Sequence, residues 1–101
     1  MARYALTIAG ILHQKNTRVY HTDDKAWDKN ISRACLYTPY QIEKIVSALH
    51  PDIKDNAVAL YVIQNNNFNY HGKTGWVYDL AEANFYELRE AEALVKSLSS
   101  A

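Results

Sequence analysis

The feature that most constrains the fold is an internal repeat. Residues 26–49 (AWDKNISRACLYTPYQIEKIVSAL) align without a gap with residues 75–98 (GWVYDLAEANFYELREAEALVKSL). A match at one fixed offset is the signature of a duplicated structural unit. The identical pairs are Trp27/Trp76, Ala34/Ala83, Tyr37/Tyr86, Glu43/Glu92, Val46/Val95 and Leu49/Leu98. We therefore expect two copies of one unit, about 1–50 and 56–101, related by a pseudo-two-fold axis.

The repeat also bears on the number of domains. A unit of about 50 residues buries too little apolar surface to be stable alone. The chain of 101 residues therefore predicts a single domain, 1–101, in which both copies share one core. Its content of 49% hydrophobic and 22% charged residues is typical of a globular protein. The alternative is a chance match in a sequence rich in alanine and tyrosine.

Each copy is expected to run strand, strand, short turn, strand and helix. Alternation of side chains with a period of two predicts the strands. Asn30 and Asp79 are good N-cap residues, and each is expected to open one helical turn before the third strand. The expected strands are Tyr4–Ile11, Arg18–His21, Cys35–Tyr37, Val58–Gln64, Phe68–His71 and Asn84–Tyr86.

Two helices follow from capping and apolar periodicity. Thr38 and Gln41 form a capping box around Pro39, and Pro51 is expected to end this helix. Apolar residues then recur at helical spacing in both copies, which gives each helix one stripe to bury. The expected core is Ile42, Ile45, Val46, Leu49, Leu94, Val95 and Leu98, buried with Leu6, Ile8, Leu60 and Val62.

The predicted fold class is α+β. Two tandem β-β-β-α repeats form one mainly antiparallel sheet of five or six strands, with two helices packed on it.

One motif in the second copy resembles a known pattern. Residues 76–92 contain Trp76-x-x-Asp79-Leu80-x-Glu82-Ala83-x-Phe85, then Arg89-Glu90-Ala91-Glu92. This string is similar to a W-x-x-D-L-x-E-A…E-A-E pattern in small phage and prophage accessory proteins, which are anti-CRISPR-like in size. The first copy departs from the pattern, with Asn30 for the aspartate and Cys35-Leu36 for the aromatic strand. The resemblance implies a phage or mobile-element accessory protein, acting in the cytoplasm of a bacterial host.

Groups suited to catalysis are sparse. His13, His21, His50 and His71 lack the close spacing of a zinc site, and Cys35 is the one thiol. His21 and His71 occupy matching positions, so the repeat either brings them together or holds them on opposite edges. The string His71-Gly72-Lys73-Thr74 lacks the upstream glycine of a phosphate loop, and a strand is expected after it. We expect no enzymatic activity, no catalytic residue, no cofactor and no metal site.

Charge bears on the partners. Eleven Lys+Arg balance eleven Asp+Glu, so no net charge attracts the chain to nucleic acid or to an anionic membrane. No apolar run approaches the roughly 18 residues of a membrane span, and the N-terminus has no signal-peptide pattern. We expect a cytoplasmic protein with a protein partner, a host defence complex or a second copy of itself, and without membrane association.

Tyrosine supplies the candidate binding residues. If Leu36 and Phe85 point at the helices, Tyr37 and Tyr86 point away from them, and Tyr61 lies opposite Leu60 on the first strand of its copy. Tyr37, Tyr61 and Tyr86 would then share an exposed face that binds a protein. The alternative is that the sheet curls and buries these rings.

Two other functions stay open. A single-stranded nucleic acid could stack its bases on the same tyrosines, although no basic groove accompanies them. A cleft between the repeats could instead serve a small-ligand binder or a minor enzyme. The favoured function is a non-enzymatic, protein-binding inhibitor of a bacterial defence complex.

Overall fold

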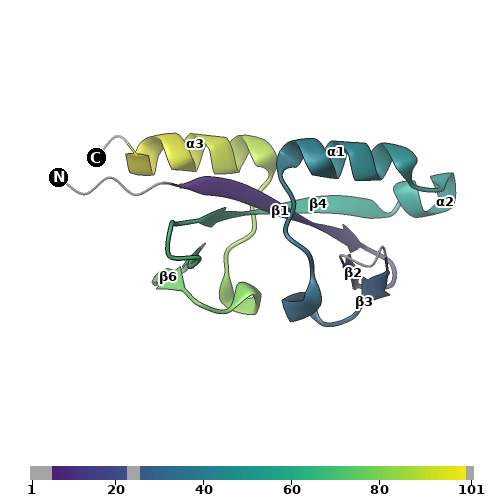
Figure 1. Cartoon of the computed structure of the whole chain (residues 1–101), viewed down its shortest axis with the longest axis horizontal. Helices are drawn as coiled ribbons and strands as arrows, with labels where there is room; N and C mark the ends of the chain where they lie inside the picture. The colour runs from purple at the N-terminus through teal and green to yellow at the C-terminus, as the bar shows by residue number, and fades with distance from the viewer. Residues whose placement is uncertain (1–5, 23–25, 100–101) are drawn as a thin grey trace.

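The structure, a computed structural model that describes residues 6–22 and 26–99, contains one antiparallel sheet of six strands (Figure 1). The strand order is β3-β2-β1-β4-β5-β6. The α+β class and the sheet with helices packed on it are confirmed. The strands are β1 (Thr7–Gln14), β2 (Val19–His21), β3 (Trp27–Asp28), β4 (Ala57–Gln64), β5 (Tyr70–Gly72) and β6 (Gly75–Val77).

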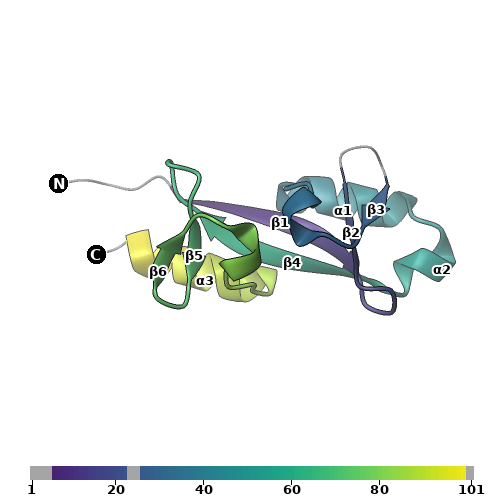
Figure 2. The ribbon, with the colours of Figure 1, turned by 90° about the horizontal axis from the view of Figure 1, so that it is seen from below.

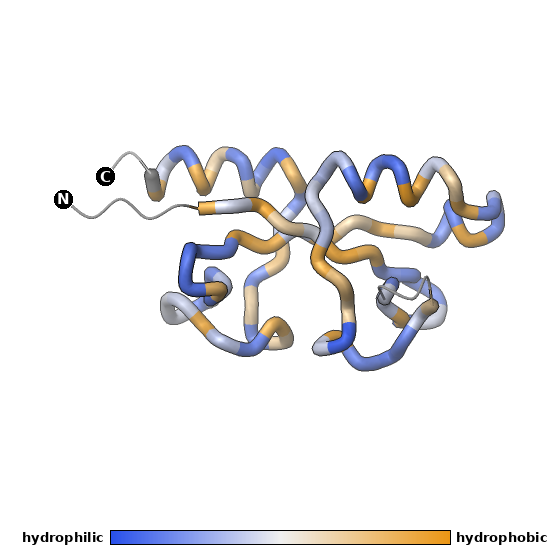
Figure 3. Tube along the Cα trace, viewed as in Figure 1, coloured by the Kyte–Doolittle hydropathy of each residue, from blue (hydrophilic) through white to orange (hydrophobic). Residues whose placement is uncertain are grey.

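The centre of the sheet is the long pair of β1 and β4. These strands are paired from Thr7↔Gln64 to Gln14↔Ala57, and much of their length is hydrophobic (Figure 3). Their apolar residues are divided between the clusters on the two faces of the sheet. Strands in the middle of a sheet are apolar on both sides because each face is covered. β1 continues to Gln14, beyond the expected end at Ile11, because β4 offers a partner over that whole length. Residues 4 and 5 of the expected strand lie outside the described residues.

Helices cover one face of this sheet. α1 (Pro39–Ala48) and α3 (Leu88–Ser99) lie end to end along it, on the same side of β1 and β4 (Figure 1). The capping box of α1 is formed: the Gln41 backbone N–H donates to Thr38 Oγ1, and the Gln41 side chain accepts from the Thr38 N–H. α1 ends before Pro51, and Pro51 is the first residue of a further short helix, α2 (Pro51–Lys54).

The other face is covered by two single turns. η1 (Ile31–Arg33) is capped by Asn30 and η2 (Leu80–Glu82) by Asp79, which confirms the two predicted turns. Each capping side chain accepts a hydrogen bond from the backbone N–H two residues later. Figure 2 looks onto this face, with the two turns in front of the sheet.

The predicted third strands are wrong. Where Cys35–Tyr37 and Asn84–Tyr86 were expected as strands, single bridges form, Gly10↔Tyr37 and Tyr61↔Tyr86. The capping box at Thr38 ends the pairing directly after Tyr37, and before it the Cys35 N–H donates to the His21 carbonyl at 3.0 Å. The outer strands form instead at the two tryptophans, in β3 and β6, which pair with β2 and β5.

The two faces have separate cores. On the helix side Leu12, Ile42, Tyr61, Ile63 and Ala91 are buried, and Ile45, Val46, Leu94 and Val95 of the two helix stripes pack against them half-buried. Leu49, expected in the same core, is the C-cap residue of α1; it is half-buried and does not belong to this cluster. On the turn side the buried cluster is Ile11, Val62, Leu80 and Ala83. Val62 is buried as expected and Leu60 is half-buried, but both belong to this cluster and not to the helix-side core.

Leu98 also departs from the expected core, because its side chain is 38% exposed. It lies in the last turn of α3, close to the end of the helix, where little of the sheet remains to pack on (Figure 1).

Candidate functional site

Each half of the chain holds a histidine between a tyrosine hydroxyl and a tryptophan ring. In the first half, His21 Nδ1 lies 2.6 Å from Tyr37 Oη, and its ring meets Trp27 edge-on at a centroid distance of 5.0 Å. In the second half, His71 Nδ1 lies 2.9 Å from Tyr86 Oη, and its ring meets Trp76 edge-on at 5.5 Å. These contacts fix the short outer strands to the segments that lead into the helices.

The two histidines are not brought together. His21 lies on β2 and His71 on β5, and the strand order places β1 and β4 between them. Over residues 6–22 and 26–99, no three His, Cys, Asp or Glu side chains gather closely enough to hold a metal ion.

Hydrogen bonds hold each histidine in place. Tyr37 Oη donates to the Thr22 carbonyl at 3.2 Å, so its single proton is used there and His21 Nδ1–H donates to Tyr37. Burial lowers the pKa of His21, which keeps the ring neutral at pH 7. In the second half Asn84 Nδ2 donates to Tyr86 Oη at 3.3 Å, and His71 Nδ1 lies 2.9 Å from the same oxygen. Both arrangements are structural, since they hold a tyrosine inside the protein.

The expected exposed face of Tyr37, Tyr61 and Tyr86 is not found. Tyr61 is 7% exposed, and Tyr37 and Tyr86 are half-buried against the same helix-side core. Burial, followed by the nearby charge of Glu43, raises the pKa of Tyr61. A role for these three side chains in protein binding stays a prediction, without the exposed face on which it depended.

The reason is a glycine opposite Tyr61. Gly10 pairs with Tyr61 across β1 and β4, and a Cβ on Gly10 would lie 2.8 Å from the Tyr61 ring. The ring therefore occupies the volume that a side chain at Gly10 would need, on the helix side of the sheet. Leu36 and Phe85 pack on the turn-side core instead, which reverses the alternation expected from the sequence.

A groove lies on the turn side, where the two halves meet. It has a volume of about 390 Å³, within the range of ligand-binding clefts. The first half contributes one wall through η1 and the segment after it, and the second half contributes the other through β5 and η2. We call it the junction groove, and its lining residues are Ser32, Ala34, Leu36, Tyr70, Tyr78, Asp79 and Leu80.

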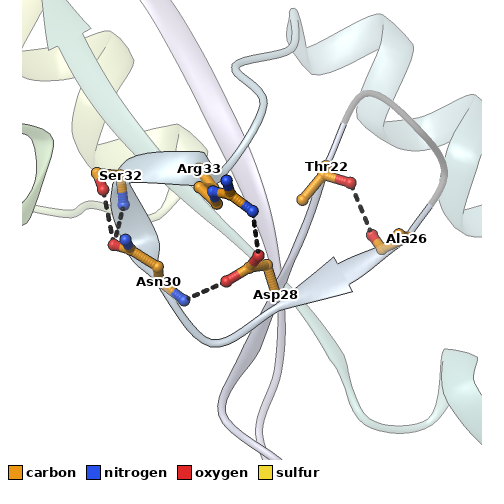
Figure 4. Close-up of polar contacts among 6 residues, drawn as sticks. All are labelled: Thr22, Ala26, Asp28, Asn30, Ser32 and Arg33. Atoms are coloured by element: carbon orange, nitrogen blue, oxygen red, sulfur yellow. Dashed lines mark hydrogen bonds and ion pairs between the residues drawn. The ribbon is translucent and has the colours of Figure 1, made fainter.

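The polar groups of this region are held in place by local hydrogen bonds. Ser32 Oγ donates to Asn30 Oδ1 at 2.6 Å, and Arg33 pairs with Asp28 at 3.3 Å (Figure 4). Asp79 Oδ1 accepts from the Ala81 backbone N–H at 3.0 Å. Among the described residues that line the groove, Asp79 is the one with a charge.

Two tyrosines complete the groove, and sequence reasoning missed both as site residues. The Tyr78 side chain is 88% exposed, whereas Tyr70 is half-buried. Burial, and then the neighbouring Tyr78, raises the pKa of Tyr70, so its hydroxyl is neutral at physiological pH. One signal could have found Tyr78: in the alignment of the two copies, this exposed aromatic residue corresponds to the charged surface residue Lys29.

The other candidate groups have local roles. Cys35 is half-buried, with Sγ 3.8 Å from the Leu36 carbonyl oxygen. His50 caps α2 by accepting from the Asp52 N–H at 3.2 Å. Lys73 and Thr74 form the turn between β5 and β6, so a strand follows the Gly-Lys-Thr string, as expected.

Comparisons of the chain with protein-family models, with curated proteins and with solved structures find no match. In the part of the chain that the structure describes, no helix combines the length and the apolar character needed to cross a membrane.

Proposed function

We propose that the chain is a non-enzymatic binding module that recognises another protein through the junction groove. The observation that carries this proposal is the exposure of Tyr78, 88%, beside the apolar side chains of Leu36 and Leu80. Tyrosine concentrates binding energy at protein interfaces because it adds a large apolar area and a hydroxyl with few rotatable bonds. An exposed tyrosine beside apolar side chains is suited to act as the anchor residue of such an interface.

Protein is favoured over single-stranded nucleic acid for two reasons. The tyrosines that were candidates for base stacking lie under the helices, and Tyr61 is buried. The groove itself carries the carboxylate of Asp79, which repels phosphate, and the chain has no net charge.

We also propose that the two halves are copies of one unit related by a pseudo-two-fold axis. The order of elements, three strands, a capped turn and a helix, occurs in each half. The contacts of His21 with Tyr37 and Trp27 have counterparts at His71, and the sequence match supports the same pairing. An experimental structure in which residues 6–50 fail to superpose on residues 57–99 would refute the duplication.

The broader role is proposed from the resemblance of residues 76–92 to phage accessory proteins. On this proposal the partner is a bacterial protein, and a defence complex is the first to test. Neutral net charge favours an inhibitor that acts by shape and an aromatic anchor over one that mimics DNA.

The test is affinity capture from a bacterial lysate, followed by titration with the purified partner. Tyr78→Ala should weaken binding by at least about tenfold, as expected for an interface anchor. Tyr40→Ala is the matched control, because Tyr40 is 65% exposed but lies on α1, on the opposite face. The proposal is refuted if both variants bind equally. It is also refuted if affinity falls steeply with salt and a single-stranded nucleic acid is what is retained.

A further inference from the structure

We infer that the junction groove binds an arginine side chain of the partner protein. This inference rests on the proposed function, because it assigns the chemistry of the group that enters the same groove. Three properties of the lining residues lead to it: an unneutralised carboxylate, hydroxyls that offer acceptors, and two aromatic rings over an apolar floor.

The first property concerns Asp79. Within residues 6–22 and 26–99 the lysine or arginine that pairs with a carboxylate is Arg33, on Asp28, so no such cation there neutralises the Asp79 carboxylate. Its Oδ1 is fixed by the Ala81 N–H, which orients the carboxylate, and a carboxylate has lone pairs for further donors. A cationic donor would therefore meet a carboxylate that is already held in position.

The second property is the hydrogen-bonding capacity of the groove. Ser32 Oγ already gives its proton to Asn30 Oδ1, so it offers the groove an acceptor. Asp79, ionised at neutral pH, offers only acceptors as well. The group that satisfies these two side chains must bring donors, and a guanidinium brings five in a planar fork. An anionic or acceptor-rich ligand would leave both unsatisfied.

The third property is the aromatic and apolar surface. Tyr70 and Tyr78 both line the groove, and a guanidinium is attracted to the face of an aromatic ring. The methylene groups of an arginine can pack on Leu36 and Leu80, since long cationic side chains bury their stems along apolar surfaces. Arginine fits better than lysine because its planar head is less strongly hydrated and stacks on aromatic rings.

The first half of the chain supplies a well-matched variant. Asn30 caps η1 with the same geometry that Asp79 uses at η2, so Asp79→Asn should keep the cap while it removes the charge. Asp52→Asn is the charge control, because it makes the same change in net charge at a side chain that is 92% exposed on α2, away from the groove.

The experiment titrates the full chain with N-acetyl-arginine methylamide and follows the backbone amide signals by NMR. The amides of the groove residues should shift with saturation, at a dissociation constant in the range of about 1 mM or weaker for a single side chain. Asp79→Asn should weaken this binding by about two- to fivefold, and Asp52→Asn should leave it unchanged. The citrulline analogue, which has the same shape without the charge, should bind more weakly by a similar factor.

Equal binding of the citrulline analogue, or unchanged binding by Asp79→Asn, overturns the arginine assignment. Shifts outside the groove alone overturn it too. These failures are distinct from failure of the proposed function, which is judged by the loss of the captured partner on Tyr78→Ala. If the partner's affinity depends on Tyr78 but is unchanged by Asp79→Asn, the junction groove remains the docking site and the assignment of an arginine is refuted.

Discussion

Gly10→Ala tests the arrangement that buries Tyr61. The added Cβ would lie 2.8 Å from Tyr61 Cδ1 and Cε1, and closer still to Ile42 Cδ1. Adding a methyl group to a packed core costs about 1–3 kcal/mol, because neighbouring side chains must leave their preferred rotamers. Alanine recovers about 0.5–1 kcal/mol through its smaller loss of backbone entropy on folding. The net expectation is a loss of about 1–2 kcal/mol in the free energy of unfolding.

The assay is urea denaturation followed by circular dichroism, in which the midpoint falls and the slope stays constant. A double-mutant cycle identifies the contact responsible. Ile42→Val removes Cδ1 and by itself costs about 0.5–1.5 kcal/mol. In that background the penalty of Gly10→Ala should shrink by about 0.5 kcal/mol or more, since the two positions are in contact.

Gly75→Ala is the control glycine substitution. A Cβ there would meet nothing within 4 Å, but the φ of +127° is strained for alanine, so its penalty should not depend on the side chain at position 42. The reasoning is refuted if Gly10→Ala is as stable as the wild type, or if its penalty is the same in the wild-type and Ile42→Val backgrounds.

Three further predictions concern stability. Burial lowers the pKa of His21, so the stability that its neutral ring contributes is complete above the ordinary value of 6.5 and is lost as pH falls through the folded pKa. Between pH 7 and 5 the urea midpoint should therefore fall less steeply with pH in His21→Asn than in the wild type. The same pH dependence in both proteins would contradict this. Thr38→Ala should lower the free energy of unfolding by about 1 kcal/mol, because the helix cap is lost. The exposed control Ser47→Ala should lower it by at most about 0.5 kcal/mol, and equal urea midpoints for the two variants would contradict the role of the cap. Leu94→Ala should lower the free energy of unfolding by about 2 kcal/mol and Leu98→Ala by less than about 1 kcal/mol, and the reverse order would contradict the packing of α3.

The sequence was sufficient for the elements whose signals are local. The capping box at Thr38 and the apolar stripe after it predict α1, and the caps at Asn30 and Asp79 predict the two turns, because each depends on residues within one helical turn. β4 was predicted closely because its apolar run is continuous. Local patterns of this kind survive in the fold because they do not depend on a distant partner.

The errors concern the pairing of one segment with another. Tyr37 forms its single bridge with Gly10 of β1, which is distant in the sequence. The strand at Trp27 depends on its pairing with the nearby β2, which the residues of β3 alone do not indicate. The junction groove was missed for the same reason. Tyr78 and Leu36 belong to different halves, and only the contact between η1 and η2 makes them parts of one surface.

The same glycine that buries Tyr61 also accounts for where the groove lies. With Tyr61 on the helix side, strand alternation directs its neighbour Val62 to the opposite face, together with Ile11 of β1. That apolar row must be covered, and the chain covers it with Leu80, Ala83 and their half-buried neighbours around the two turns. Because η1 and η2 span three residues each, they cover the row from two sides and leave the junction groove between them. Tyr37, Tyr61 and Tyr86, which were expected on an open face, lie on the helix side instead. The exposed tyrosine at the groove is Tyr78, which was not among the predicted residues.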